Sequence, residues 1–175
     1  MMPVRLPLLL WVPMGLALAL SLSACLGPDT SSKPPLYRNL AEVSGDLDEA
    51  AARDMINAYR ANNGLAPVAL DDRLNALAQA YARELAAEAG TGASIRPDGK
   101  LDTRLAGAGY QQAEVKESVT AGYYTLAEAF SGWRDSPPHR EVMLLPSARD
   151  LGIAAVYRSG TKYKVYWVLV MAEPA

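Results

Sequence analysis

The residues best suited to chemistry in this chain are a histidine and a glutamate that stand in short polar motifs. His139 is the only histidine of the sequence and follows Ser-Pro-Pro, while Glu117 lies upstream in Lys-Glu-Ser-Val-Thr-Ala-Gly. Imidazole exchanges its proton near neutral pH, which makes His139 a candidate general acid or base. Such a role also requires a nucleophile or a water molecule within hydrogen-bonding distance.

The candidate nucleophiles are serine hydroxyls, at Ser94, Ser118, Ser136 and Ser147. None of them stands in the Gly-x-Ser-x-Gly turn that exposes the nucleophile of many hydrolases. A catalytic zinc site needs three protein ligands, and the chain has one histidine, one cysteine at position 25 and no His-x-x-x-His motif. The sequence therefore predicts no metal centre and no cofactor.

The order of motifs between residues 117 and 153 resembles the bacterial branch of the CAP superfamily, which comprises cysteine-rich secretory proteins, antigen 5 and pathogenesis-related proteins. In that branch a Glu-Asn-hydrophobic-x-Ala-Gly segment precedes a helix, followed by Gly-Trp, Ser-Pro-Gly-His-Arg and a glycine-containing strand. The corresponding segments here are 117–122, 132–133, 136–140 and 151–153. The resemblance covers about residues 47–172 and implies a single-domain α-β-α sandwich of the CAP type.

CAP domains gather two histidines and one or two acidic residues around a central cleft, where some members bind zinc. The resemblance implies that Glu117 and His139 are two of these residues, and that Ser94 stands where the other histidine would be. Ser118 and Pro138 replace the family's usual asparagine and glycine. The implied cleft lacks one histidine and consists of Ser94, Glu117, Ser118, Tyr123 and His139.

Two functions are compatible with this cleft. Because the histidine set is incomplete and some CAP relatives bind sterols or fatty acids, the resemblance implies a non-enzymatic binding module for an apolar small molecule, a lipid or an envelope component. The alternative is a metal-independent or degenerate hydrolase of a peptide or cell-wall substrate, with His139 as base and Glu117 orienting it. A third interpretation is structural: the pair would hold a strand against a helix through a buried charge-assisted hydrogen bond.

The N-terminal residues have the pattern of an export signal. Residues 6–22 are almost wholly apolar, Arg5 supplies a positive charge before them, and small residues end the run. A transmembrane helix is the competing interpretation, against which two prolines in the segment argue. Residues 1–24 are therefore predicted to be a signal peptide that is cleaved before Cys25.

Residues 22–25, Leu-Ser-Ala-Cys, also resemble a bacterial lipobox, in which the cysteine is diacylated and becomes the mature N-terminus. Cys25 is the only cysteine of the chain, so its position predicts lipidation rather than a disulfide, with an ordinary signal peptide as the alternative. The protein is thus expected to be exported and attached to a membrane by its lipid. Leu26 after the cysteine favours the periplasmic face of the outer membrane over the inner membrane.

Composition divides the remaining chain into a tether and one domain. Residues 25–44 contain a Pro- and Ser-rich run that predicts a flexible tether, and residues 45–173 have the length of one domain with one core. The formal net charge of −2 provides no basic patch, so nucleic acid is not an expected partner. The expected partners are the membrane, through the anchor, and a lipid or other apolar ligand.

The elements that must position the candidate residues follow from hydrophobic periodicity. Apolar residues recur at helical spacing in four segments, the last of which begins after a capping box at Thr125 and ends at two prolines: 47–62, 72–89, 101–108 and 126–136. Strand-like residues fill three segments, of which the last two form a hairpin: 113–119, 150–157 and 163–171. Trp133 shares a helix face with Leu126 and Phe130, which predicts core packing rather than a sugar platform. This order of elements predicts a single α+β domain.

Overall fold

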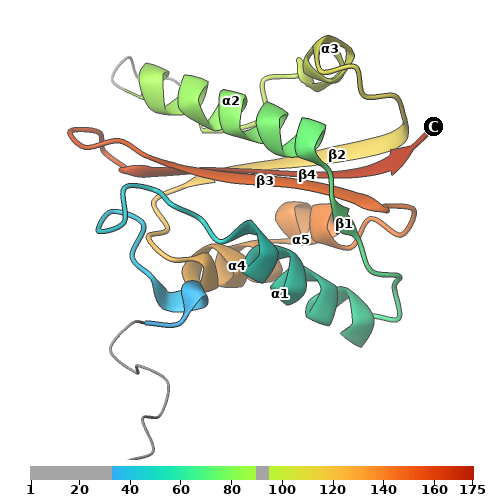
Figure 1. The fold of residues 1–175 in the computed structure, drawn as a ribbon, viewed down its shortest axis with the longest axis horizontal. Helices are drawn as coiled ribbons and strands as arrows, with labels where there is room; N and C mark the ends of the chain where they lie inside the picture. The colour runs from blue at the N-terminus through green and yellow to red at the C-terminus, as the bar shows by residue number, and fades with distance from the viewer. Residues whose placement is uncertain (1–32, 90–94) are drawn as a thin grey trace, which may run out of the picture. The chain divides into compact units, whose positions relative to one another are not determined.

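The computed structural model describes residues 33–89 and 95–175, which form a four-stranded sheet with helices on both faces (Figure 1). The strand order is β1-β3-β4-β2. In chain order the elements are η1 (Pro35–Tyr37), α1 (Glu49–Asn62), β1 (Ala69–Leu70), α2 (Asp72–Glu88), α3 (Leu101–Gly107), β2 (Gln112–Ala121), α4 (Leu126–Asp135), α5 (Pro137–Met143), β3 (Asp150–Tyr157) and β4 (Val165–Pro174). The predicted α+β class and α-β-α sandwich are confirmed.

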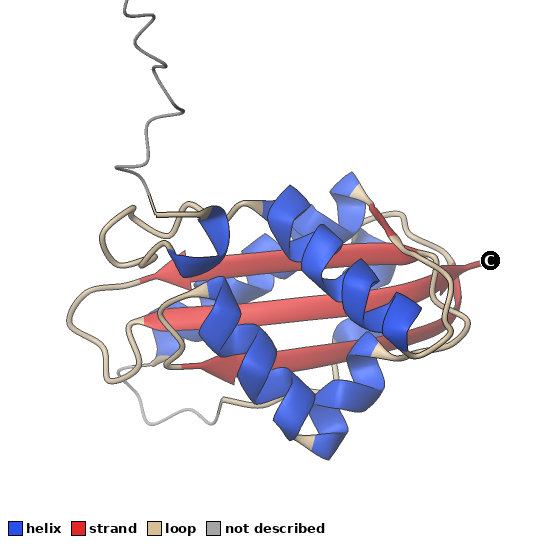
Figure 2. Cartoon of the chain, turned by 90° about the horizontal axis from the view of Figure 1, so that it is seen from below, coloured by secondary structure: helices blue, strands red, loops and turns tan. Residues whose placement is uncertain are grey.

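The predicted hairpin is present as β3 and β4, which form the centre of the sheet. The two strands are antiparallel and pair from Asp150 with Ala172 to Tyr157 with Val165. Strand β2 pairs antiparallel with the other edge of β4, and the short β1, which periodicity did not predict, pairs parallel with β3. Every residue of β4 from Val165 to Ala172 is buried, because helical layers cover both faces of the sheet (Figure 2).

Alternation along β4 divides its buried side chains between two cores. One core is formed with α1, α4 and α5 and receives Val165, Trp167, Leu169 and Met171. The other is formed with α2 and α3 and receives Tyr166, Val168, Val170 and Ala172. In Figure 1 these two helical layers lie below and above the sheet, respectively. The sheet therefore separates two sets of side chains that cannot meet through it.

The helix starts follow local capping chemistry. Helix α1 begins at Glu49, because the side chain of Asp48 accepts a hydrogen bond from the Ala51 N–H and caps the first turn. The capping box at Thr125 and Glu128 is present in α4 as predicted. Among the helices that the structure describes, none is both long enough and apolar enough to cross a membrane.

Two prolines end α4 and also begin α5. Pro137 and Pro138 occupy the first turn of α5, where the missing N–H groups would have no partner within the helix in any case. His139 consequently lies in the first turn of a short helix that packs against β2. The sequence predicted the end of α4 here but gave no bounds for a second helix.

A fully buried arginine connects α1 to the end of α5. Arg60 has no solvent exposure, and its guanidinium donates hydrogen bonds of 2.9 to 3.3 Å to the carbonyl oxygens of Ala66, Met143, Leu145 and Ala148. These carbonyls supply the polar contacts that a buried charge requires. Arg60 therefore fixes the position of α5, and with it the position of His139, relative to α1.

The segment before α1 packs against the domain, which corrects part of the predicted tether. Leu40 is 2% exposed, its N–H donates to the Tyr124 carbonyl at 2.8 Å, and Leu36 packs against the same core. Residues 35–44 thus belong to the folded domain, because their scattered apolar side chains find a long-range partner surface. The predicted signal peptide and Cys25 lie outside the described residues.

Candidate functional site

Strand β2 presents Glu117 and Ser118 to opposite faces of the sheet, because successive residues of a strand alternate. Ser118 faces the same layer as Thr120, whose hydroxyl accepts a hydrogen bond from the indole of Trp133 in α4. Glu117 faces the other layer, where it contacts Arg104 of α3. The residues of the predicted cleft are therefore divided between the two layers.

On the α3 side, Glu117 forms an ion pair that is almost fully withdrawn from solvent. Both of its carboxylate oxygens accept hydrogen bonds from Nη2 of Arg104, at 3.2 and 2.9 Å, and its side chain is 5% exposed. Nη1 of Arg104 donates to Asp98 at 2.8 Å, and the guanidinium carbon lies 3.6 Å from the centre of the Tyr81 ring. One cation thus binds two carboxylates and an aromatic face.

Burial and charge act in opposite directions on this cluster. Burial raises the pKa of Glu117, while the neighbouring Arg104 opposes the rise by stabilising the carboxylate. The same environment raises the pKa of Tyr81 to about 12, chiefly through burial. Because Arg104 engages both oxygens of Glu117, the geometry favours an ion pair that holds α3 on the sheet over a carboxylate that exchanges protons with a substrate.

On the opposite side of the sheet, His139 contacts β2 through Ser118. Nδ1 of His139 lies 2.7 Å from Oγ of Ser118, and Ser118 is 1% exposed. Burial lowers the pKa of the half-buried His139, so its imidazole is neutral at pH 7. A neutral ring hydrogen-bonded to a buried hydroxyl connects the first turn of α5 to the sheet.

The predicted contact in which Glu117 orients His139 is not formed. Glu117 is bonded to Arg104 and His139 to Ser118, with the backbone of β2 between the two pairs. The physical reason is the pleat of the strand: neighbouring residues 117 and 118 point in opposite directions. Ser118 meets His139 closely enough for proton transfer, but with 1% exposure it is withdrawn from solvent.

The remaining residues that the sequence analysis singled out lie away from the contact between Ser118 and His139 or outside the described residues. Ser94 lies outside the described residues. Tyr123 follows β2, and its backbone carbonyl accepts a hydrogen bond from the Trp167 indole at 2.9 Å. Trp133 is fully buried and stands edge-on to Trp167 with ring centres 5.7 Å apart, which confirms core packing. Within residues 33–89 and 95–175, no three His, Cys, Asp or Glu side chains are grouped so that they could hold a metal ion.

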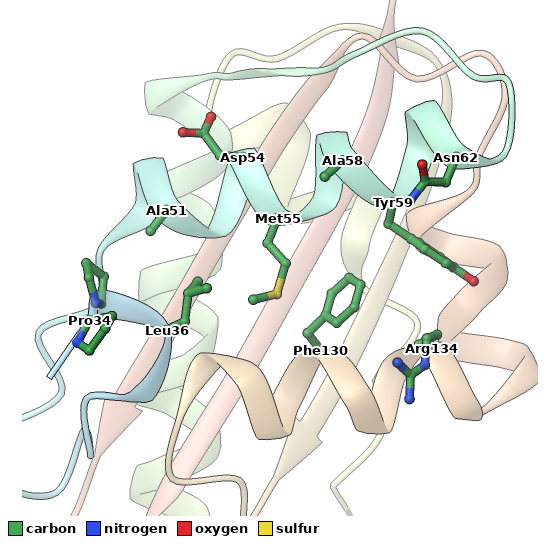
Figure 3. A pocket seen from close by; sticks show the side chains of 11 residues that line it. Pro34, Leu36, Ala51, Asp54, Met55, Ala58, Tyr59, Asn62, Phe130 and Arg134 are labelled. Carbon is green, nitrogen blue, oxygen red and sulfur yellow. The ribbon is translucent and has the colours of Figure 1, made fainter.

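An apolar groove of about 690 Å³ lies between η1, α1 and α4, on a side of the domain where the sequence predicted no site (Figure 3). The rings of Tyr59 and Phe130 meet edge to face in it, with centres 5.5 Å apart. Its apolar lining includes Leu36, Ala51, Met55, Ala58, Tyr59 and Phe130. The polar side chains of Asp54, Asn62 and Arg134 also border it.

A sequence signal for this groove exists in α1. Ala51, Met55, Ala58 and Tyr59 recur at helical spacing, beside a second stripe of Ala52 and Ile56 that is fully buried. Two adjacent apolar stripes are more than one core contact requires. The sequence of α1 does not indicate which of the two stripes stays partly exposed, because this depends on where α4 and η1 pack.

A second hollow, of about 500 Å³, lies between α2 and α3 and is bordered by Leu77, Ala80 and Arg104. The guanidinium of Arg104 is already bonded to Glu117 and Asp98. This hollow therefore has an apolar floor, and its two cations, Arg73 and Arg104, are both ion-paired with carboxylates of the chain.

Comparison with known families identifies the domain. Residues 53–171 match the model of CAP, the Cysteine-rich secretory protein family. Among curated proteins, none matches this chain.

Solved structures share the fold at low sequence identity. An outer surface protein from Borrelia burgdorferi is 18% identical, with a TM-score of 0.61 over 73% of this chain and 93% of that protein. An extracellular protein with an SCP domain from Bacillus anthracis is 19% identical, with a TM-score of 0.59 over 71% of this chain and 39% of that one. A cysteine-rich secretory protein from Staphylococcus aureus is 17% identical, with a TM-score of 0.55 over 81% and 41%.

The chain thus spans about two fifths of the length of the proteins from Bacillus anthracis and Staphylococcus aureus, and what these matches share with it is the fold. The family match extends over most of the described domain, from α1 to β4, and includes β2, α4 and α5 with the residues discussed above. On this match, the chain belongs to the CAP family of cysteine-rich secretory proteins.

Proposed function

We propose that this CAP-domain protein is a non-enzymatic binding module of the cell envelope, and that its ligand is a lipid with a long acyl chain. The observation that carries the proposal is the apolar groove between η1, α1 and α4. Its volume of about 690 Å³ falls within the range of small-molecule sites, about 300–1,000 Å³. The side chains of Leu36, Met55 and Phe130 converge on it from three elements (Figure 3).

The chemistry of the groove suits a hydrocarbon chain with a polar end. Each methylene that the groove removes from water contributes about 0.8 kcal/mol, so a long chain is bound better than a short one. Arg134 borders the groove with 46% of its side chain exposed. Its Nε and Nη2 donate to Asp135 at 2.8 and 3.2 Å, and an anionic group of the ligand would meet the exposed guanidinium beside this ion pair. An acyl chain that lies along α1 with its anionic group at Arg134 would contact both the apolar lining and the cation of the groove.

The alternative function, a metal-independent hydrolase, receives less support from the geometry. It would depend on Ser118 and His139 alone, because Glu117 is bonded to Arg104 on the other face of the sheet. A nucleophile must reach its substrate, and Ser118 is 1% exposed. The contact between these two residues is better explained as an attachment of α5 to β2.

Export and lipid attachment are part of the proposal and are supported by the sequence of residues 1–25. Two relatives of the same fold are described as an extracellular protein and as an outer surface protein. Cys25 precedes Pro34 at the groove by nine residues, and this length of chain spans at most about 30 Å. An acylated Cys25 on the periplasmic face of the outer membrane would keep the groove within reach of membrane lipids.

A matched pair of alanine substitutions tests the proposed ligand. Ala58→Glu places a charge in the groove, whereas Ala80→Glu places the same charge on α2 in the hollow of the other layer. We expect the wild-type protein and Ala80→Glu to bind a fluorescent long-chain fatty acid with equal affinity, and Ala58→Glu to bind it at least tenfold more weakly, about 1.4 kcal/mol. Both alanines are exposed, so both variants should keep the fold.

Two results would contradict the proposal. If Ala58→Glu binds the fatty acid as well as the wild type does, the groove is not the site. If the wild-type protein binds no fatty acid, and native mass spectrometry of protein purified without detergent finds no co-purifying lipid, the lipid-binding function itself fails.

A further inference from the structure

A third cavity, a hollow, also borders η1 and α4, and polar side chains make up more of its lining than of the apolar groove. It has a volume of about 540 Å³ and is bordered by η1, α4 and the chain between β2 and α4. Its lining combines phenol rings, hydroxyls and carboxylates, in Tyr37, Tyr123, Thr125, Glu128, Ser131 and Asp135. Among the described residues that border it, none carries a positive charge.

The groove and the hollow border the same two elements, η1 and α4. In η1, Leu36 lines the groove and the next residue, Tyr37, lines the hollow. In α4, Arg134 lines the groove and Asp135 lines the hollow. Successive residues of a helix are rotated by about 100°, so Arg134 and Asp135 face different sides of α4. A ligand that reaches both cavities would cross the exposed surface of α4 between these two residues.

An ion pair marks the border between the two compartments. Nε of Arg134 donates to the Asp135 carboxylate at 2.8 Å, with the cation toward the groove and the anion toward the hollow. Asp135 is 67% exposed, and its hydrogen bond with Arg134 lowers its pKa, so the carboxylate is ionised and accessible. The border therefore presents a positive and a negative group, in that order, to a molecule that extends from the groove into the hollow.

The hollow also provides an exposed aromatic face. Tyr37 is 58% exposed and is the one large hydrophobic residue with such exposure in the described part of the chain. A phenol ring beside a carboxylate attracts quaternary and primary ammonium groups through cation–π and ionic contacts. Tyr123 adds a second ring to the same hollow.

We infer that the hollow binds the ammonium end of a zwitterionic phospholipid, whose phosphate contacts Arg134 and whose acyl chain lies in the groove. This inference rests on the proposed lipid-binding function and adds a choice of head group to it. Arg134 matches a phosphate, and Asp135 with Tyr37 matches the ammonium group. A phospholipid with a glycerol head offers the same chains and phosphate but no cation for the hollow.

Competition against the fluorescent fatty acid tests the head-group choice on the full chain. The competitors are water-soluble phosphatidylcholine and phosphatidylglycerol with identical short acyl chains, and phosphocholine without chains. We expect phosphatidylcholine to compete about tenfold better than phosphatidylglycerol. Asp135→Asn and Tyr37→Leu should each bring this ratio close to one, while Glu84→Gln, which removes an exposed carboxylate from α2 on the other layer, should keep it.

Three other outcomes would contradict the head-group choice or the lipid-binding function. Equal competition by the two phospholipids, with the fatty acid bound normally, overturns the head-group choice but leaves the proposed function intact. Phosphocholine that competes as well as the whole lipid shows that a free ammonium compound is the ligand of the hollow. A wild-type protein that binds no fatty acid overturns the proposed function instead.

Discussion

At the scale of single residues, His139 and Glu117 respond to different surroundings because β2 lies between them. Glu117 faces Arg104 and Asp98, so its protonation is coupled to charged neighbours. His139 faces the hydroxyl of Ser118, and burial is the cause of its lowered pKa. The two residues of the family motif therefore contribute separately to the stability of the domain.

The lowered pKa of His139 predicts how stability changes with pH. The imidazole binds its proton less readily in the folded state than in the unfolded chain, whose ordinary value is 6.5. The unfolded state therefore takes up more protons as the pH falls through that value, so the free energy of unfolding decreases. Solvent weakens the effect of burial on this half-exposed ring. We therefore expect the free energy of unfolding to decrease by less than about 1 kcal/mol between about pH 7 and pH 5.

Urea unfolding of the wild type and of His139→Gln over this pH range measures that loss. The variant cannot titrate at this position, and the chain has no other histidine, so its free energy of unfolding should fall less steeply toward acid pH. Identical slopes for the two proteins would show that His139 titrates as it does in the unfolded chain.

At the scale of the elements, the sheet and α2 approach each other too closely for a side chain at one position. A Cβ atom added to Gly152 of β3 would overlap the backbone carbonyl of Leu74 in α2. The next residue, Ile153, donates its N–H to the side chain of Asn75 at 2.9 Å. Glycine in the Leu-Gly-Ile motif thus has a packing reason: it allows the helix to rest on the strand.

Gly152→Ala should therefore destabilise the domain. The obstacle is helix backbone rather than a flexible side chain, so we expect the free energy of unfolding to fall by about 1–3 kcal/mol. Gly107→Ala is the control, because its added Cβ meets nothing within 4 Å and alanine favours a helix by up to about 1 kcal/mol. Chemical denaturation measures both, and equal tolerance at the two positions would contradict the close approach of β3 and α2.

At the scale of the whole molecule, the groove and the predicted anchor belong to one proposal, since the chain enters the described domain beside the groove. Pro34 and Leu36 line the groove, and residues 35–44 pack against the same core as α1 and α4. Two or three acyl chains at Cys25 would bind a membrane firmly, because each buried methylene contributes about 0.8 kcal/mol.

Cys25→Ala tests the anchor. We expect this variant to move from the membrane fraction to the soluble periplasmic fraction and to lose incorporation of labelled palmitate. Ser32→Ala, outside the predicted lipobox, should remain membrane-bound and labelled. A wild-type protein that is exported without a label would show that residues 1–24 are an ordinary signal peptide.

Local patterns predicted most of the elements, because their causes lie within a few residues. Helical spacing identified α1, α2, α3 and α4, the capping box located the start of α4, and β-branched and aromatic residues identified the hairpin. Strand β1 was not predicted because it has two residues, too few for any periodicity. Residues 35–44 were assigned to a tether because they follow a Pro- and Ser-rich run and their scattered apolar residues form no periodic pattern.

The sequence by itself determined the family motifs, four of the helices, and the three longer strands with their order along the chain. Tertiary structure alone decided that Glu117 pairs with Arg104 and His139 with Ser118, and that η1, α1 and α4 leave a groove between them. The physical reason is that periodicity and capping depend on neighbouring residues. The face to which a strand residue points, and the space that remains between helices, depend on contacts between segments far apart in the chain.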